Sequence, residues 1–464
     1  MIDSASLSAL LSPEEVREAA LQAGFTKRPG GKLDPHAFLM AMVFRLLSST
    51  PPSLALLTTF MNCVMSRPSL HSRFGKAAEE LFRRCLQIII LKRVGKKAAV
   101  GAEALSPFKR LLVIDSTAWE LPERLSWAFA GCGGAASEAG VKLQFMFDYL
   151  SAEFIDLTET AGNRPDQKHG VVAARLTRRG DLHLADLGYW SFNALKEIHD
   201  RGAYFVSRLN VRQHVWICDA DGRKLEEADP IDLLEKVNRS AVEMNVQIRS
   251  GKRVLPVRLV AWRVPREVAE ERRRKKRAEA KKKGRTPTAR SLALCDWSIF
   301  VTNADAGLIQ ADMIRTVYRI RWSVELVFKS WKSVLFVHRT NVRSNASRLR
   351  CEIYAKMIFA VIVHRLYAGI QGELWATEKR ELSLDKLWKY VSSKATDLHL
   401  ASLRGVQALS KLLMEMVPEI IRTCEKLHQK SRKTSLQMIN DNAGDENPEH
   451  IDYKVLISKI LKLA

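Results

Sequence analysis

The stretch Tyr318-Arg-Ile-Arg-Trp-Ser-Val-Glu-Leu-Val-Phe-Lys-Ser-Trp-Lys332 spaces four polar residues in the pattern Y-x2-R-x3-E-x6-K. We expect a helix over 311–332, which places Tyr318, Arg321, Glu325 and Lys332 within an arc of about 60°, because a helix advances about 100° per residue. One carboxylate then lies among three side chains that can hold phosphate oxygens. Such a face is typical of a metal-dependent site acting on a nucleic acid strand. The alternative is an ordinary surface ion pair between Arg321 and Glu325, with Tyr318 in the core.

The composition favours a nucleic acid as the partner. The chain of 464 residues predicts two to four domains. It carries 74 Lys and Arg against 51 Asp and Glu, a net charge of +23, and such a surplus repels itself unless it meets a polyanion. An anionic membrane surface is the alternative partner. The most apolar segment, 351–370, contains four ionisable residues, so it predicts a buried helix rather than a bilayer span.

Other sequence signals concern the compartment and small-molecule cofactors. The seven cysteines are odd in number and form no C-x2-C pair, which argues against a disulfide framework or a zinc site and indicates a reducing cytoplasm. The N-terminus lacks the basic segment of a signal peptide. A phosphate-binding loop of the form G-x4-G-K-[ST] is missing from the sequence, so we expect no use of ATP.

The periodicity of apolar residues predicts a mixed α/β fold. Helices are expected at the N-terminus, including one that begins after Ser12 with a capping box and one over 35–47, and again over 350–430 and 452–462. The alternation over 242–248 and 254–264 predicts a hairpin within a β-rich insertion. Further strands are expected over 110–115, 141–148, 154–160, 182–186, 204–208 and 295–302.

Two acids complement the glutamate of the opening stretch. Asp115 and Asp186 each end a short apolar strand, which is where an acid can reach solvent and a metal ion. Phosphoryl transfer with two metal ions needs about three convergent carboxylates, so we expect Asp115, Asp186 and Glu325 to be catalytic residues and metal ligands. Alone, either aspartate could instead be a turn or helix cap.

These residues resemble the bacterial DDE transposases of the insertion-sequence-four family. The trio of acids and the Y-x2-R-x3-E-x6-K signature carry the resemblance, which covers about residues 105–345. The blocks 115–122, 133–142 and 162–167 also resemble the family. The resemblance implies a transposase that binds the terminal inverted repeats of an insertion sequence and moves it by DNA cleavage and strand transfer, with Mg²⁺ (Mn²⁺ can substitute). In similar enzymes a DNA hairpin is an intermediate.

The resemblance also implies a domain arrangement. We expect an α/β, RNase H-like catalytic domain, in which helices flank a mixed five-stranded sheet, with a β-rich insertion and helical regions at both ends. The corresponding boundaries are a helical DNA-binding region at 1–105, the catalytic core at 106–210, the insertion at 211–303, the second part of the core at 304–372, and a helical, possible dimerisation region at 373–464.

Several residues are expected to contact DNA on this reading. Tyr318, Arg321 and Lys332 should hold phosphates near the scissile bond. Arg208 follows the second acid, where family members place a DNA-contacting arginine. Trp297 and Trp322 are candidates for stacking on a base, worth about 1–3 kcal/mol, or are core tryptophans. Lys142, which ends one of the shared blocks, completes the predicted DNA-binding set.

Three further alternatives stay open at the level of sequence. The basic run 272–285 contacts DNA backbone non-specifically or is a solvated loop. The enzyme is a transposase or an RNase H-like nuclease without strand transfer. A third possibility is a non-catalytic DNA-binding protein derived from a transposase. The expected partners are double-stranded DNA and a second copy of the chain in a synaptic complex, with no membrane, in a bacterial cytoplasm.

Overall fold

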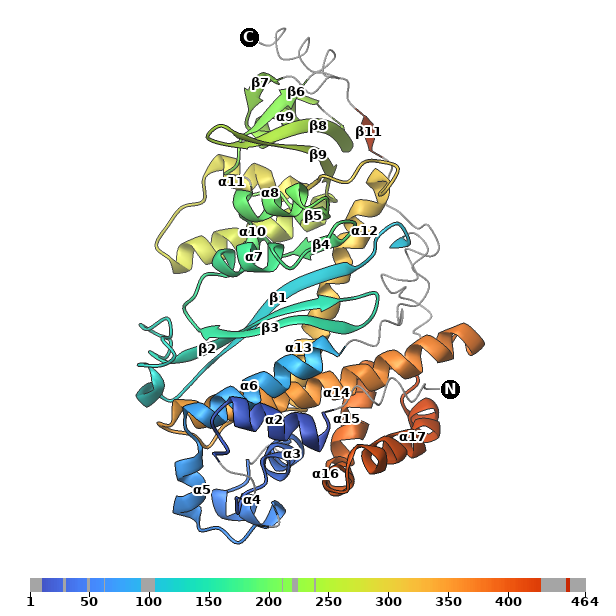
Figure 1. Cartoon of the computed structure of the whole chain (residues 1–464). Helices are drawn as coiled ribbons and strands as arrows, with labels where there is room; N and C mark the ends of the chain where they lie inside the picture. The colour runs from blue at the N-terminus through green and yellow to red at the C-terminus, as the bar shows by residue number, and fades with distance from the viewer. Residues whose placement is uncertain are drawn as a thin grey trace. The chain divides into compact units, whose positions relative to one another are not determined.

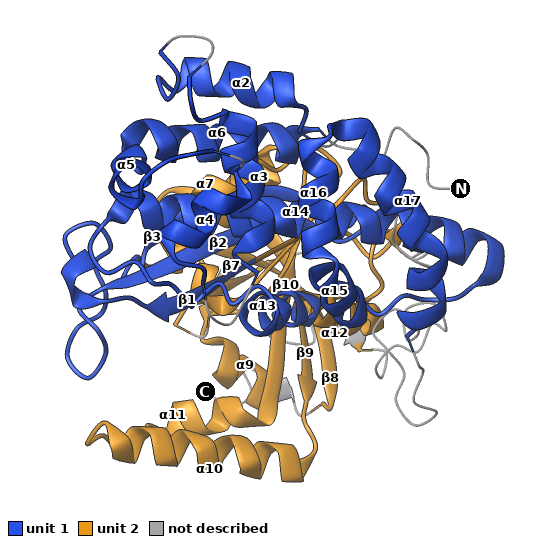
Figure 2. Cartoon of the chain, turned by 90° about the horizontal axis from the view of Figure 1, so that it is seen from below, with its two compact units in different colours: residues 1–100, 115–164, 322–432 blue, residues 101–114, 165–321, 433–464 orange. Residues whose placement is uncertain are grey.

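The computed structural model describes residues 11–27, 31–47, 51–61, 63–92, 105–210, 212–218, 224–237, 239–426 and 448–450. Its helices and strands form a mixed α/β fold (Figure 1). The chain divides into two compact units, coloured separately in Figure 2. Unit 1 comprises residues 1–100, 115–164 and 322–432, and unit 2 comprises residues 101–114, 165–321 and 433–464.

The N-terminal part of unit 1 is helical, as predicted. Ser12 caps the first described helix and forms a reciprocal capping box with Glu15, so two backbone N–H groups at this end gain acceptors. The second helix is almost wholly buried, in keeping with its apolar sequence. The helices are α2 (Pro13–Gln22), α3 (Pro35–Arg45), α4 (Leu54–Phe60), α5 (Arg67–Arg73) and α6 (Lys76–Leu91).

The long helix α14 (Ala346–Glu378) forms the centre of unit 1. It packs against α6 and α3, so the N-terminal helices share a core with a segment near the other end of the chain. By length and composition α14 could cross a membrane, and 72% of its most apolar window is buried among other elements of the protein. The remaining helices of this unit are α13 (Ser323–Ser333), α15 (Leu384–Ser393), α16 (Ala395–Leu403) and α17 (Val406–Thr423).

Three strands contribute to unit 1, in the order β3-β2-β1. The antiparallel pair β2 (Gly140–Asp148) and β3 (Glu153–Ala161) confirms the strands predicted there. Strand β1 (Leu111–Glu120) is shared: its first four residues belong to unit 2 and the remainder to unit 1.

Unit 2 contains a mixed sheet in the order β1-β4-β5-β10-β9-β8-β6-β7, with β11 on β8. Strand β1 pairs in parallel with β4, and β4 in parallel with β5, whereas β10 is antiparallel to both β5 and β9. The predicted hairpin is confirmed as β8 and β9. The strands are β4 (Leu182–Ala185), β5 (Tyr204–Arg208), β6 (Val215–Cys218), β7 (Lys224–Ala228), β8 (Ala241–Ser250), β9 (Arg253–Arg263), β10 (Trp297–Thr302) and β11 (Glu449–His450).

One apolar core supports this sheet. It gathers inward side chains from β5, β6, β8, β9 and β10, together with residues of the helices that cover them. Burial of these side chains is the main source of stability here, at roughly 25 cal/mol per Å² of apolar surface. The helices of unit 2 are α7 (Asp166–Ala174), α8 (Phe192–Asp200), α9 (Pro230–Val237), α10 (Arg266–Lys282), α11 (Ala289–Ala293) and α12 (Ile314–Arg319).

The structure corrects three sequence-based expectations. Strand β1 does not end at Asp115 but continues to Glu120. The helix expected over 311–332 is divided into α12 and α13 by a 3₁₀ turn, η6 (Ile320–Trp322). The basic run 272–285 is largely helical, since α10 extends to Lys282, so the solvated-loop interpretation is wrong. The helix predicted at 452–462 lies outside the described residues.

Candidate functional site

Strands β1 and β4 lead into the first two predicted catalytic acids. Their parallel register pairs Ile114 with Ala185, and an aspartate is the next residue along each strand. Asp186 follows the last residue of β4, as predicted. Asp115 instead lies within β1, where its Oδ1 accepts a hydrogen bond of 2.8 Å from the backbone N–H of Ser116.

The third predicted acid lines an open hollow in unit 1. Glu325 and Lys332, both exposed, lie seven residues apart on α13 and therefore on the same face, as the opening pattern predicts. The opposite wall is β1, which contributes two hydroxyl side chains next to Asp115. No sequence motif pointed to these hydroxyl groups or to a second lysine in the hollow. The lining residues are Ser116, Thr117, Glu325, Phe328, Lys329, Lys332 and Ser333.

An aromatic cluster holds the helix that carries Glu325. Trp331 is fully buried, and its ring centroid lies 5.0 Å from that of Phe145 and 6.1 Å from that of Phe154. Phe328, one turn earlier on α13, lies 5.3 Å from Trp331. Because these contacts fix the buried face of α13, they also orient Glu325 on its exposed face.

The first half of the opening pattern has a different environment. Tyr318 and Arg321 are buried in unit 2, and the 3₁₀ turn η6 precedes α13, so the expectation that one continuous helix aligns all four residues is wrong. The Tyr318 hydroxyl donates a hydrogen bond of 3.2 Å to the carbonyl of Ala185, directly before Asp186. The Arg321 guanidinium lies 5.8 Å from the centre of the Tyr318 ring. Burial raises the pKa of Tyr318, so the phenol is a neutral hydrogen-bond donor near neutral pH.

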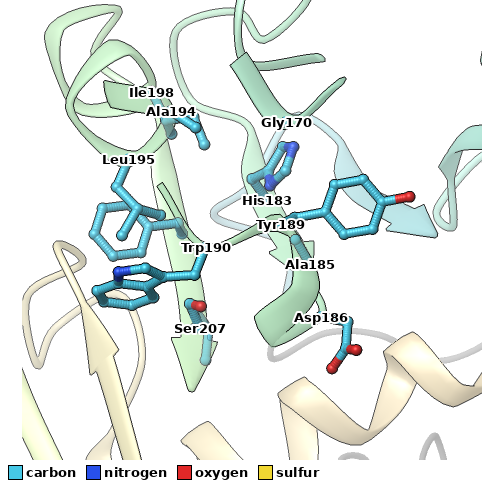
Figure 3. A pocket seen from close by; sticks show the side chains of 12 residues that line it. Gly170, His183, Ala185, Asp186, Tyr189, Trp190, Ala194, Leu195, Ile198 and Ser207 are labelled. Carbon is cyan, nitrogen blue, oxygen red and sulfur yellow. The ribbon is translucent and has the colours of Figure 1, made fainter. Parts of the chain in front are cut away.

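A small, mostly apolar pocket in unit 2 lies next to Asp186. Asp186 lines it together with His183 and Ser207 (Figure 3). Burial lowers the pKa of His183 to about 4, so this imidazole is neutral at physiological pH. The pocket therefore places a neutral imidazole and apolar side chains beside Asp186.

The other predicted DNA contacts differ in exposure. Arg208 is exposed at the end of β5, and Trp322 is 59% exposed, so both are accessible to a ligand. Trp297 is 2% exposed and belongs to the core of unit 2, with the Arg263 guanidinium 4.9 Å from its ring. This placement favours the core interpretation of Trp297. Lys142 donates a hydrogen bond of 2.9 Å from Nζ to the carbonyl of Arg164.

The cations of helix α10 fall into two groups: those of its first half are bonded to other residues, and those of its second half are exposed. Arg272 donates to the carbonyls of Cys295 and Trp297, at 3.5 and 3.0 Å, and Arg273 forms an ion pair with Asp296. These contacts attach the first half of α10 to the start of β10. The second half is rich in Lys and Arg and is largely exposed.

The predicted metal ligands are all oxygen donors. Carboxylates are the ligands that Mg²⁺ and Mn²⁺ prefer, and Glu325 presents its carboxylate to an open hollow. Among the described residues, no three side chains of His, Cys, Asp and Glu are gathered closely enough to hold a metal ion. The grouping of Asp115, Asp186 and Glu325 therefore stays a prediction.

Comparison with known proteins finds transposases among families, sequences and solved structures. Residues 106–362 match the family described as "Transposase DDE domain". The chain is 29% identical over 443 residues to the transposase for insertion sequence element IS231B of Bacillus thuringiensis subsp. berliner, covering 91% of this chain and 92% of that protein. It is 21% identical over 441 residues to the transposase for IS1151 of Clostridium perfringens, covering 92% and 93%. Among solved structures, a cryo-EM structure of a piggyBac transposase synaptic complex with hairpin DNA matches with a TM-score of 0.41 and 13% identity, over 92% of this chain and 84% of that one.

Proposed function

The chain belongs to the DDE transposase family, and from this premise we propose that it excises an insertion sequence at its terminal inverted repeats and joins the freed ends to target DNA. The observation that carries the proposal is the β1–β4 register, because Ile114 and Ala185 pair and each is followed by an aspartate. Glu325, in the hollow beside β1, supplies a third carboxylate.

We propose that Asp115, Asp186 and Glu325 hold Mg²⁺, with Mn²⁺ as a substitute. Divalent metal ions are the cofactors of this family, and three carboxylates suit a hard cation. Bound metal would lower the pKa of a coordinated water and neutralise charge on the attacking and leaving oxygens. On the resemblance to this family, Asp115 would be shared between two ions, and Asp186 and Glu325 would each hold one.

The residues around these acids are proposed to hold DNA. Lys332 faces the same hollow as Glu325 and can hold a phosphate as a point charge. Arg208 and Trp322 are exposed and suit a phosphate contact and base stacking, respectively. Tyr318 and Arg321 are buried, so we propose that they act mainly by fixing the end of β4 before Asp186.

Two of the residues predicted to contact DNA could do so only after losing an interaction that they make in the folded protein. Lys142 can reach a phosphate only by giving up its hydrogen bond to Arg164, and Trp297 can stack on a base only if β10 leaves its core position. The exposed second half of α10 is proposed to contact DNA backbone non-specifically, because its cations repel one another without a polyanion.

We propose that the catalytic domain is RNase H-like with a β-rich insertion at 211–303. The strand order β3-β2-β1-β4-β5 supports this, since it gives a mixed five-stranded sheet with three parallel neighbours. The helical region at 1–105 is proposed to bind DNA, and the helical region at 373–464 is proposed to form the dimer of a synaptic complex. The proposed setting is the bacterial cytoplasm, on DNA.

The test uses purified protein, Mg²⁺ and duplexes that carry the element's ends. Asp115→Asn, Asp186→Asn and Glu325→Gln are each expected to reduce cleavage by on the order of 10³-fold while DNA binding persists. Glu123→Gln is the matched control, because it removes one exposed carboxylate outside the proposed site. Cleavage that survives in Glu325→Gln would show that the metal ligands are assigned wrongly.

The same assay separates the alternatives. A transposase joins the freed 3′-hydroxyls to target DNA, so labelled ends appear in a target plasmid. Cleavage without joining would favour an RNase H-like nuclease. Binding without metal-dependent cleavage would favour a DNA-binding protein derived from a transposase.

A further inference from the structure

Unit 1 contains an open groove that lies outside the proposed metal site. We name it the α5–α14 groove, and it is lined by Arg67 and His71 of α5 on one side and by residues 341–345 and Arg348 on the other. The two sides come from segments separated by most of the chain, yet both belong to unit 1. The groove is therefore formed where the N-terminal helices meet the start of α14.

Hydrogen bonds hold the two sides of the groove in place. The side-chain amide of Asn341 donates to the carbonyl of Pro51 at 2.8 Å, and that of Asn345 donates to the carbonyl of Phe74 at 3.1 Å. Arg348 forms a buried ion pair of 3.1 Å with Glu352. The groove is thus preformed, so ligand binding would not require the loss of conformational entropy that ordering its sides would cost.

The charge that lines the groove is of one sign. Arg67 and Arg343 are exposed, and neither side chain forms a hydrogen bond or ion pair with another of the described residues. None of the described residues that line the groove is acidic. His71 and Ser344 add polar groups that can donate to an oxygen. A ligand with anionic oxygens, such as a phosphate, fits this lining.

We propose that the α5–α14 groove binds the phosphate backbone of duplex DNA. This inference rests on the proposed function, and it assigns a DNA contact to a place that the metal site does not reach. The groove is open, as a continuous polyanion requires, and the chain carries a net charge of +23. Arg67 and Arg343 hold phosphates, and His71 and Ser344 position the strand between them.

The experiment measures how salt weakens DNA binding. Each phosphate contact contributes about 0.9 to the slope of log affinity against log salt, so Arg67→Gln with Arg343→Gln should lower that slope by about 2. Between about 50 and 200 mM salt, the affinity of the double variant should therefore fall about tenfold less than that of the wild type. The probe is a short labelled duplex of arbitrary sequence, because a backbone contact is independent of sequence.

Three controls isolate the groove. Lys389→Gln with Lys411→Gln removes the same charge from exposed, ion-paired positions of α15 and α17, and should leave the slope unchanged. The melting temperature of the groove variant should equal that of the wild type, because both arginines are exposed. Arg67→Lys with Arg343→Lys should retain the slope, since lysine keeps the charge.

The outcomes separate the inference from the proposed function. A wild type that binds and cleaves DNA, with a groove variant of unchanged slope, overturns the inference alone. Absence of DNA binding by the wild type overturns the proposed function as well. If inorganic phosphate raises the melting temperature of the wild type but not of the groove variant, while the duplex slope is unchanged, the groove is a small-anion site and the DNA assignment is wrong.

Discussion

Replacing Trp331 with alanine should loosen the helix that presents Glu325. The indole is fully buried and contacts the rings of Phe145, Phe154 and Phe328, so its removal takes away a large apolar surface and leaves a cavity. Truncation of a buried tryptophan costs about 3–5 kcal/mol of the free energy of unfolding. We also expect cleavage to fall by about 10²-fold or more, because a displacement of about 1 Å at a catalytic group has that effect.

Urea unfolding followed by far-ultraviolet circular dichroism measures the loss of stability. Trp331→Ala should lower the transition midpoint of the protein without changing the slope of the transition. Trp322→Ala is the matched control, because this tryptophan is 59% exposed and its truncation should change stability by about 0.5 kcal/mol or less. A loss below about 1 kcal/mol in Trp331→Ala would refute the claim that the aromatic cluster anchors α13.

Three further predictions follow from buried or crowded groups. Burial lowers the pKa values of His183 and His364 to about 4 and about 3. The unfolded chain therefore binds protons at these side chains at a higher pH than the folded chain does, so stability should fall as pH drops from about 6.5 towards 4. Melting temperatures measured across this range should fall less in His183→Gln than in the wild type. Asp181→Ala should cost about 3–5 kcal/mol in chemical denaturation, because it leaves the partner cation Arg110 unpaired; a midpoint like that of the wild type would contradict this. Gly162→Ala should lower the melting temperature at a cost of about 1–3 kcal/mol, because its Cβ would lie 2.8 Å from a backbone carbon of the facing strand.

Local patterns were sufficient to predict most of the sheet. Strand β2 and the hairpin β8–β9 could be predicted from their residues, because apolar residues recur along each of these strands, although almost every residue of β2 is buried. The continuation of β1 past Asp115 could not be predicted in this way. Its residues Ser116–Glu120 are mostly polar, and hydrogen bonds to neighbouring strands extend β1 instead of an apolar pattern.

The candidate site was predicted in part. Glu325 and Lys332 share an exposed face because they lie seven positions apart on an unbroken helix. The 3₁₀ turn η6 interrupts the pattern before them, and the burial of Tyr318 and Arg321 depends on packing that no spacing encodes. Helix α10 was not predicted, because a run of like charges is also typical of a solvated loop; its residues, Arg, Lys, Glu and Ala, are nevertheless all good helix formers.

The packing of α14 against α3 and α6 has a consequence for how the protein is made. Nearly every residue of α3 is buried, yet the helix that covers it begins at Ala346. At about 5–20 residues per second, the ribosome needs on the order of 15–60 s to reach that helix after α3 emerges. During this interval the apolar helix α3 has been synthesised, but α14, which packs against it, has not. We therefore expect interrupted or truncated translation products of this gene to aggregate or to be degraded, so that only a finished chain reaches DNA.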